Sequence, residues 1–191
     1  MTTFNRLNLP GKLGLLVAVA IAVSACSDQA PTDEASVPVA DPEIAREAMS
    51  GMELPATIGS WLVNCDTQMA APAGCFAQFS YVDGKTRKPV VTWTLGFNRA
   101  GELLSEFRSP IDVMIEPGVT AYFWDNRPEK TNYVSCRTDG CLSRTRISRT
   151  LLDNLKTDPE VTFVITNADG KEVSFKITTD KTRQAVRLLG L

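Results

Sequence analysis

Apolar and polar side chains alternate with a period of two along most of the chain from Ile58 onward. The segment Pro89–Phe97 shows this most clearly, because valine, tryptophan, leucine and phenylalanine alternate there with threonine and glycine. A period of two is typical of a β-strand with one buried face. The same pattern predicts strands at Gly59–Cys65, Cys75–Val82, Ile111–Glu116, Val119–Trp124, Asn132–Cys136, Cys141–Ile147, Val161–Thr166 and Glu172–Ile177.

Many short strands separated by turn residues predict an all-β sandwich. In the segment Ile111–Glu116, we expect Ile111, Val113 and Ile115 to face the core. The aromatic residues at inward positions of the other strands are predicted to form the centre of that core: Trp61, Phe79, Trp93 and Phe163.

Three segments depart from the period of two. Ser148–Lys156 carries leucines at helical spacing behind Ser148, a good N-cap, and predicts one short helix. Nearer the N-terminus, Asp41 as N-cap and Pro42 at the first helical position predict a short helix over residues 42–50. Thr182–Leu189 fits either a closing helix or a closing strand.

A hairpin is predicted around residues 132–147. Cys136 and Cys141 bracket four loop residues that end in Gly140, a spacing that suits a type I turn with glycine in the left-handed position. Such a loop places Cys136 directly opposite Cys141, close enough to form a disulfide. The same register places Tyr133 opposite Arg144, where a cation–π contact is expected.

The first 25 residues are predicted to be a signal peptide. Two basic residues precede the apolar run Leu13–Val23, which is too short to span a bilayer comfortably. The following Ser-Ala-Cys completes the pattern of a bacterial lipobox, which predicts cleavage between Ala25 and Cys26 and attachment of diacylglycerol to the Cys26 sulfur. An ordinary signal peptide that happens to precede a cysteine is the alternative. Serine rather than aspartate at position 27 favours the outer membrane over the inner membrane.

Residues 26–56 are predicted to be a tether, since they are rich in alanine and proline and carry seven acidic residues against one arginine. The folded domain is expected to cover residues 57–191. The net charge of the chain is −2. A nucleic-acid-binding domain would need a strongly basic surface, so we expect no nucleic-acid partner.

Histidine is absent from the chain. This removes the commonest general base and metal ligand, and a Ser-His-Asp or Cys-His nucleophile cannot be assembled. Phosphate-binding glycine loops, dinucleotide fingerprints and carboxylate-rich metal loops are also missing from the sequence. We therefore expect no catalytic residue, metal or cofactor, and we favour a binding module. The alternative is an envelope hydrolase or enzyme modulator whose site does not use histidine.

Four cysteines besides Cys26 remain in the mature chain: Cys65, Cys75, Cys136 and Cys141. Four cysteines can pair in three ways, and spacing alone does not choose between them. The hairpin argument favours the local pairing. A zinc site with four thiolates is the alternative, which the oxidising environment of an exported protein disfavours.

The order of several motifs resembles the invasion-associated locus B family of exported bacterial proteins. They are Trp61-x-Val63-x-Cys65, Cys75, Ser109-Pro110-Ile111, Pro117-Gly118-Val119, Asp125, the Cys136–Cys141 block with Gly140, and Leu155-Lys156. The resemblance covers about Ile58–Leu191. It implies an immunoglobulin-like β-sandwich with one short helix and two disulfides, Cys65–Cys75 and Cys136–Cys141. The family takes its name from a pathogen member linked to entry into host red cells.

Two surfaces are candidate partner sites. The first is an anion-binding patch formed by arginines on and around the predicted hairpin: Arg137, Arg144, Arg146 and Arg149. A solvated strand face is the alternative interpretation of these arginines. The second is an aromatic interface formed by Tyr122 and Trp124. The expected partners are the membrane, through the acyl chains on Cys26, and an envelope or host protein or glycan. The sequence does not indicate the oligomeric state.

Overall fold

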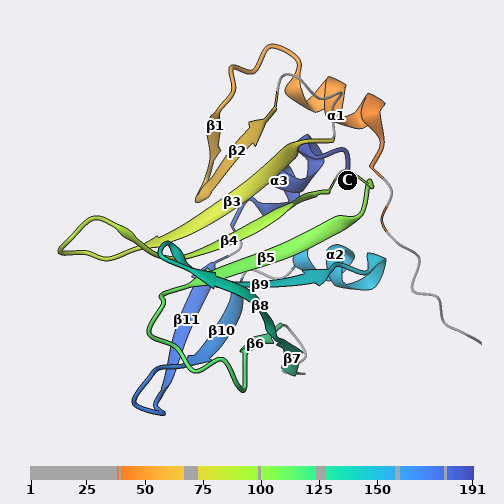
Figure 1. Cartoon of the computed structure of the whole chain (residues 1–191). Coiled ribbons are helices and arrows are strands. Elements are labelled where there is room, and N and C mark those ends of the chain that lie inside the picture. The colour runs from red at the N-terminus through yellow and green to blue at the C-terminus, as the bar shows by residue number, and fades with distance from the viewer. Residues whose placement is uncertain are drawn as a thin grey trace, which may run out of the picture. The chain divides into compact units, whose positions relative to one another are not determined.

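The computed structural model describes residues 38, 40–66, 73–98, 100–123, 128–157, 160–178 and 180–191. Eleven strands in these ranges form two antiparallel sheets (Figure 1). The larger sheet has seven strands, in the spatial order β1 (Ala56–Ile58), β2 (Trp61–Cys65), β3 (Cys75–Val82), β4 (Pro89–Phe97), β5 (Leu103–Ser109), β9 (Gly140–Arg146) and β8 (Tyr133–Arg137). The smaller sheet has the order β11 (Glu172–Thr178), β10 (Glu160–Thr166), β6 (Val119–Tyr122) and β7 (Pro128–Thr131).

The predicted all-β sandwich is confirmed. The first five strands form a meander in one sheet, a simpler connectivity than the alternation between sheets in an immunoglobulin domain. The two sheets meet through aromatic side chains, because the Phe163 ring on β10 stacks on Phe107 at 4.4 Å and meets Trp93 edge-on at 5.2 Å. Trp61 and Trp93 are fully buried, as their inward positions in the sequence predicted.

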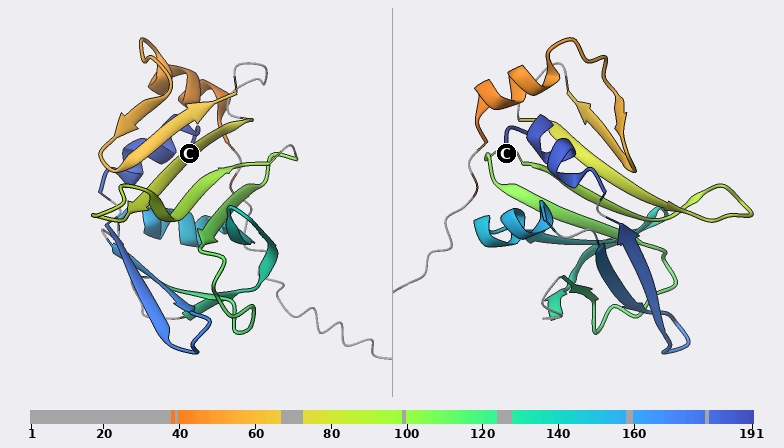
Figure 2. Two further views of the ribbon diagram at one scale, coloured as in Figure 1. Left: turned by 60° about the vertical axis from the view of Figure 1, so that its left-hand side comes forward. Right: turned by 180° about the vertical axis from the view of Figure 1, so that it is seen from behind.

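The larger sheet extends past the smaller one, and helices cover the remaining inner face (Figure 2). Helix α3 (Thr182–Leu188) lies over β2, and Trp61 Nε1 donates a hydrogen bond of 3.2 Å to Thr182 Oγ1. The segment that fitted either a helix or a strand is therefore a helix, and it buries Ala185, Val186 and Leu188. Helix α2 (Arg149–Leu155) begins after the predicted N-cap Ser148, whose hydroxyl accepts from the amide of Leu151.

Helix α1 (Pro42–Met49) packs against α3. Its predicted N-cap is correct, since the Asp41 carboxylate accepts hydrogen bonds from the amides of Glu43 and Ile44. An isolated helix of this length is marginal in water, so α1 depends on the domain for its stability. The signal peptide and the first part of the tether lie outside the described residues and stay predictions.

One predicted strand is wrong. Residues Ile111–Glu116 form turns with a single bridge from Val113 to Asn167, and the Ile111 and Ile115 side chains are 61% and 55% exposed. The segment is bounded by Pro110 and Pro117, neither of which can donate to a sheet. The preceding segment forms the strand β5, which the sequence did not predict. Serines occupy two of its inward positions and interrupt the apolar alternation.

Both disulfides predicted from the family resemblance are present. Cys65 pairs with Cys75 between β2 and β3, and Cys136 pairs with Cys141 between β8 and β9. The predicted contact between Tyr133 and Arg144 is wrong, because the register shifts between Tyr133 and Ser135. This shift places Tyr133 opposite Ser143, which faces the other side of the sheet from Arg144.

Candidate binding surface

The outer face of the seven-stranded sheet contains an open groove with a volume of about 990 Å³. Its walls come from β3, β4, β5 and β9, at the positions that alternate with buried core residues. The pairing register aligns these positions into transverse rows. One row contains Phe76, Gly96, Leu104 and Arg146; the next contains Gln78, Thr94, Glu106 and Arg144. We call this surface the outer groove.

Gly96 forms the floor of the outer groove. It lies in the interior of β4, where a glycine weakens a strand and often marks a place that another group approaches closely. A Cβ atom at this position would lie 3.0 Å from both the Phe76 Cβ and the Cys75 carbonyl oxygen. Because position 96 has no side chain, the half-buried Phe76 and Leu104 present apolar surface on either side of an open floor.

Two ion pairs between β9 and the segment Glu102–Glu106 border this floor. Arg144 contacts the Glu106 carboxylate at 2.6 Å, and Arg146 contacts Glu102 at 2.7 Å. A third pair joins Arg108 on β5 to Asp139 at 2.8 Å and lies outside the groove lining. All three are partly exposed to solvent, so each contributes little to stability. The first two pairs fix the positions of charges along the edge of the groove, where they can complement charges on a partner.

The four arginines of the predicted anion patch do not form one cluster of unpaired cations. Arg144 and Arg146 lie in the outer groove with their glutamate partners. Arg137 ends β8, and Arg149 begins α2; both are exposed, and neither has an ion pair with another described residue. Anion binding by these residues stays a prediction. Sequence reasoning missed Gly96, Glu102 and Glu106, although a glycine inside an otherwise regular strand could have indicated the groove.

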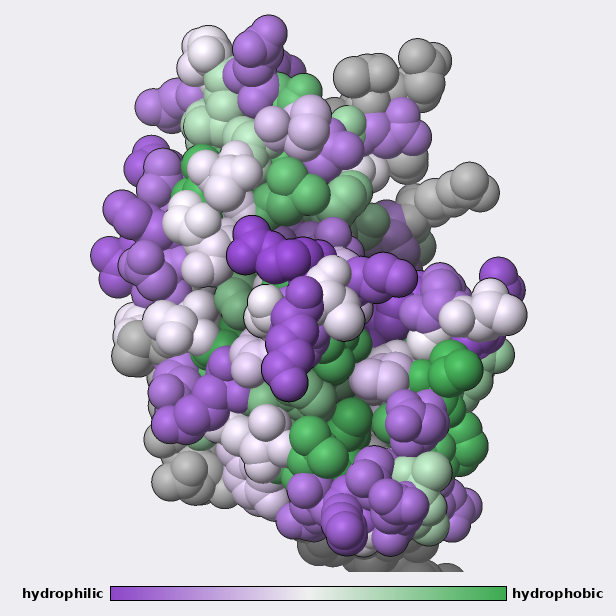
Figure 3. Space-filling view, turned by 90° about the vertical axis from the view of Figure 1, so that its left-hand side faces the viewer, coloured by the Kyte–Doolittle hydropathy of each residue, from purple (hydrophilic) through white to green (hydrophobic). Residues whose placement is uncertain are grey.

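The predicted aromatic interface is described only in part. Tyr122 is half-buried at the end of β6, while Trp124 lies outside the described residues. Another group of exposed apolar side chains follows β5: Ile111, Met114 and Ile115. Apolar residues cover several areas in the lower half of the view in Figure 3, between hydrophilic residues.

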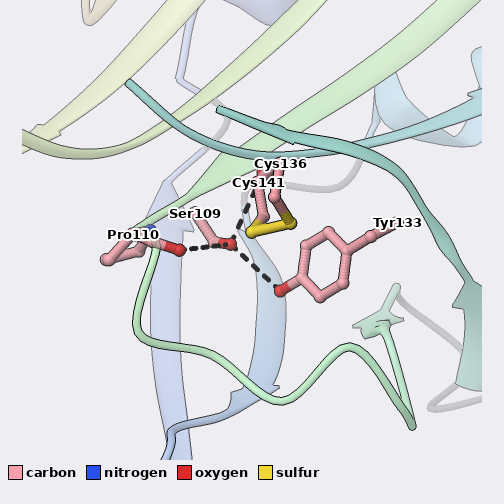
Figure 4. Close-up of a disulfide and its surroundings, with 5 residues drawn as sticks. All are labelled: Ser109, Pro110, Tyr133, Cys136 and Cys141. Atoms are coloured by element: carbon pink, nitrogen blue, oxygen red, sulfur yellow. Dashed lines mark hydrogen bonds between the residues drawn. A yellow bond between two sulfur atoms is a disulfide. The ribbon is translucent and has the colours of Figure 1, made fainter. Parts of the chain in front are cut away.

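The Cys136–Cys141 disulfide lies beside a small network of hydroxyl groups (Figure 4). The buried Ser109 hydroxyl lies 3.0 Å from the Tyr133 hydroxyl, 3.3 Å from the Pro110 carbonyl and 3.5 Å from the Cys141 carbonyl. Burial raises the pKa of Tyr133 above its ordinary value of 10.0, and the hydrogen bond with Ser109 lowers it in part. The network anchors the hairpin to the end of β5.

Within the described ranges, we found no group of three or more Cys, Asp or Glu side chains arranged to hold a metal ion. No helix among the described residues is long and apolar enough to cross a membrane. The predicted lipidation site, Ala25 and Cys26, lies outside the described residues.

The model of the family described as "Invasion associated locus B (IalB) protein" matches residues 61–189. The chain belongs to the IalB family. The outer groove lies wholly within the part of the chain that matches the IalB model, as do both disulfides.

A solved structure supports the same fold. The crystal structure of invasion associated protein B from Bartonella henselae matches 72% of this chain and 96% of that chain, with a TM-score of 0.62 and 18% sequence identity. At this identity, the similarity shows that the two proteins share a fold. It does not indicate what this chain binds. No significant match was found among curated proteins.

Proposed function

We propose that this IalB-family protein is a lipid-anchored component of the bacterial cell envelope that binds a partner protein through the outer groove. The observation that carries the binding role is the groove itself, an open volume of about 990 Å³ with apolar surface from Phe76 and Leu104 on either side of its floor and fixed charges along its edge. An apolar centre with a polar rim is the usual composition of a protein-binding surface. The disulfides restrain strands that shape this surface, which reduces the cost of ordering it on binding.

The proposed location rests on the sequence. The apolar run before Val-Ser-Ala-Cys supports export and acylation at Cys26, and the acidic segment after it supports a tether between the membrane and the domain. Growth with a labelled fatty acid should label the wild-type protein and leave the Cys26→Ser variant unlabelled. Equal labelling of both proteins would contradict anchoring through Cys26.

The binding role can be tested by photo-crosslinking in living cells. A photoreactive amino acid at Thr94, in the centre of the groove, should capture a partner protein. The same amino acid at the exposed Ser174, on β11 of the smaller sheet, is the matched control. Capture of the same species at both positions, or of none at Thr94, would contradict a partner protein in the groove.

A charge exchange separates recognition from stability. The double variant Glu106→Arg/Arg144→Glu keeps one cation and one anion at directly opposed positions but reverses the direction of the pair. We expect crosslinking through Thr94 to fall at least tenfold, because the charges offered to the partner are inverted. The melting temperature should change by only a few degrees, because an exposed pair contributes about 0–1 kcal/mol. Unchanged crosslinking would show that the pair is structural.

A further inference from the structure

A second cavity lies inside the sandwich, at the end where α2 covers the space between the sheets. Its volume is about 240 Å³. Most of its wall is apolar: the aromatic rings of Trp93, Phe107 and Phe163 come from the two sheets, and Leu151 and Leu155 come from α2. An engineered apolar cavity of about 150 Å³ binds benzene, so this space is large enough for one small aromatic ring.

The cavity also has hydroxyl groups on its wall, at core-facing positions of β5 and β9. Ser143 is 3% exposed, lines the cavity, and makes no side-chain hydrogen bond with any described residue. Ser105 also lines it and accepts a hydrogen bond of 2.8 Å from Trp93 Nε1, which leaves the proton of the Ser105 hydroxyl available. No fully buried side-chain nitrogen or oxygen atom of the described residues lacks a hydrogen-bond partner. The Ser143 hydroxyl is therefore open to the cavity, where it can exchange a hydrogen bond with an occupant.

Charged residues are confined to the mouth of the cavity. Glu129 is exposed, and the Arg146 side chain is 71% exposed and paired with Glu102. The deeper wall offers only apolar side chains and neutral hydroxyls. Burial of a charged group against such a wall is strongly unfavourable. An occupant must therefore be uncharged at its inner end.

We propose that this cavity binds one small uncharged aromatic molecule that carries a hydroxyl group, with phenol as the simplest representative. The ring packs against Phe107 and Phe163, where edge-to-face and stacked contacts are favourable. The hydroxyl group of the ligand exchanges a hydrogen bond with Ser143. This proposal does not rest on the proposed partner-binding role: the two sites share Thr145 and Arg146 in their linings, but Ser143, Phe107 and Phe163 line only the cavity.

Phenol and toluene are nearly equal in shape and differ in the hydroxyl group, so their comparison tests the proposal. Calorimetry on the disulfide-bonded domain should show saturable binding of phenol that is tighter than that of toluene. Ser143→Ala should weaken phenol binding about three- to tenfold, the usual effect of one neutral hydrogen bond, and leave toluene binding unchanged. Ser174→Ala, at an exposed position of β11, should change neither affinity.

Two further measurements locate the bound probe. Ala121 is 7% exposed and lines the cavity, so Ala121→Leu should fill the space and abolish the binding of both probes. Independently of that variant, nuclear Overhauser effects should connect phenol protons with the rings of Phe107 and Phe163 in the wild-type protein. Absence of saturable phenol binding, absence of these effects, or equal phenol affinity in wild type and Ser143→Ala would overturn the proposal and leave the cavity as a site for water.

Discussion

The backbone amide of Asp41 donates a hydrogen bond of 2.8 Å to the carbonyl oxygen of Gly190. This bond joins the start of α1 to the end of α3, two segments that lie at opposite ends of the folded domain in sequence. Gly190 has a φ of +79°, and a Cβ atom there would lie 2.5 Å from the Asp41 carbonyl oxygen. The close approach of the two backbones is therefore possible only with glycine at position 190.

Replacement of Gly190 by alanine should release α1 from the domain. We expect Gly190→Ala to lower the free energy of unfolding by about 2–4 kcal/mol, from the positive φ and the backbone clash together. Limited proteolysis should then cut within residues 40–56. Gly170→Ala is the matched control, because Gly170 has a similar φ of +77° and nothing within 4 Å of its Cβ position. Equal losses in the two variants would show that backbone strain alone is responsible.

The hydrogen bond from Trp61 to Thr182 should hold α3 against the larger sheet. Both residues are buried, at 0% and 2% exposure, so Thr182→Val leaves the indole N–H without this acceptor in a dry environment. We expect a loss of about 1–3 kcal/mol in chemical denaturation. Thr182→Ser keeps the hydroxyl group and should lose less than Thr182→Val. A larger loss in Thr182→Ser than in Thr182→Val would show that the methyl group of Thr182, and not its hydroxyl group, stabilises the fold.

The two disulfides should contribute separately to stability. In the chain-entropy model, the smaller ring of Cys136 and Cys141 contributes about 2.2 kcal/mol and the larger ring of Cys65 and Cys75 about 2.8 kcal/mol. Denaturation of the double variants Cys136→Ala/Cys141→Ala and Cys65→Ala/Cys75→Ala should show losses of this order. Intact-mass analysis of the wild-type protein should find no free thiol at these four positions. Four free thiols would contradict the covalent framework.

Tyr133 should make stability fall at alkaline pH. Its folded-state pKa is raised above 10.0 by burial, so the unfolded chain releases the phenolic proton at a lower pH than the folded one. The stabilising contribution is complete below about pH 10 and is lost as the pH rises through the folded-state pKa. Tyr133→Phe cannot ionise at this position, so its unfolding free energy should fall less steeply above pH 10. Identical slopes for the two proteins would contradict this assignment.

Local features of this fold follow from local sequence. Asp41 and Ser148 cap helices because their side chains reach amides within three residues, and both caps are visible in the sequence. The loop between Cys136 and Cys141 is short enough to bring them into one rung of the sheet. By contrast, β5 was missed because Ser105 and Ser109 occupy inward positions, where an apolar alternation would have identified the strand. Those hydroxyl groups have partners only in the folded protein, in Trp93 and Tyr133.

The sequence by itself determined the sandwich, two helix caps and the hairpin that brings Cys136 opposite Cys141, because these depend on periodicity and on contacts between close neighbours in the chain. Tertiary structure decided the two candidate sites. The outer groove exists because three neighbouring strands place Phe76, Gly96 and Leu104 in one row. The cavity exists because Ser143 of the larger sheet and Phe163 of the smaller sheet line the same space between the sheets. Such alignments depend on register between distant segments, and a shift of one residue would turn every one of these side chains to the opposite face.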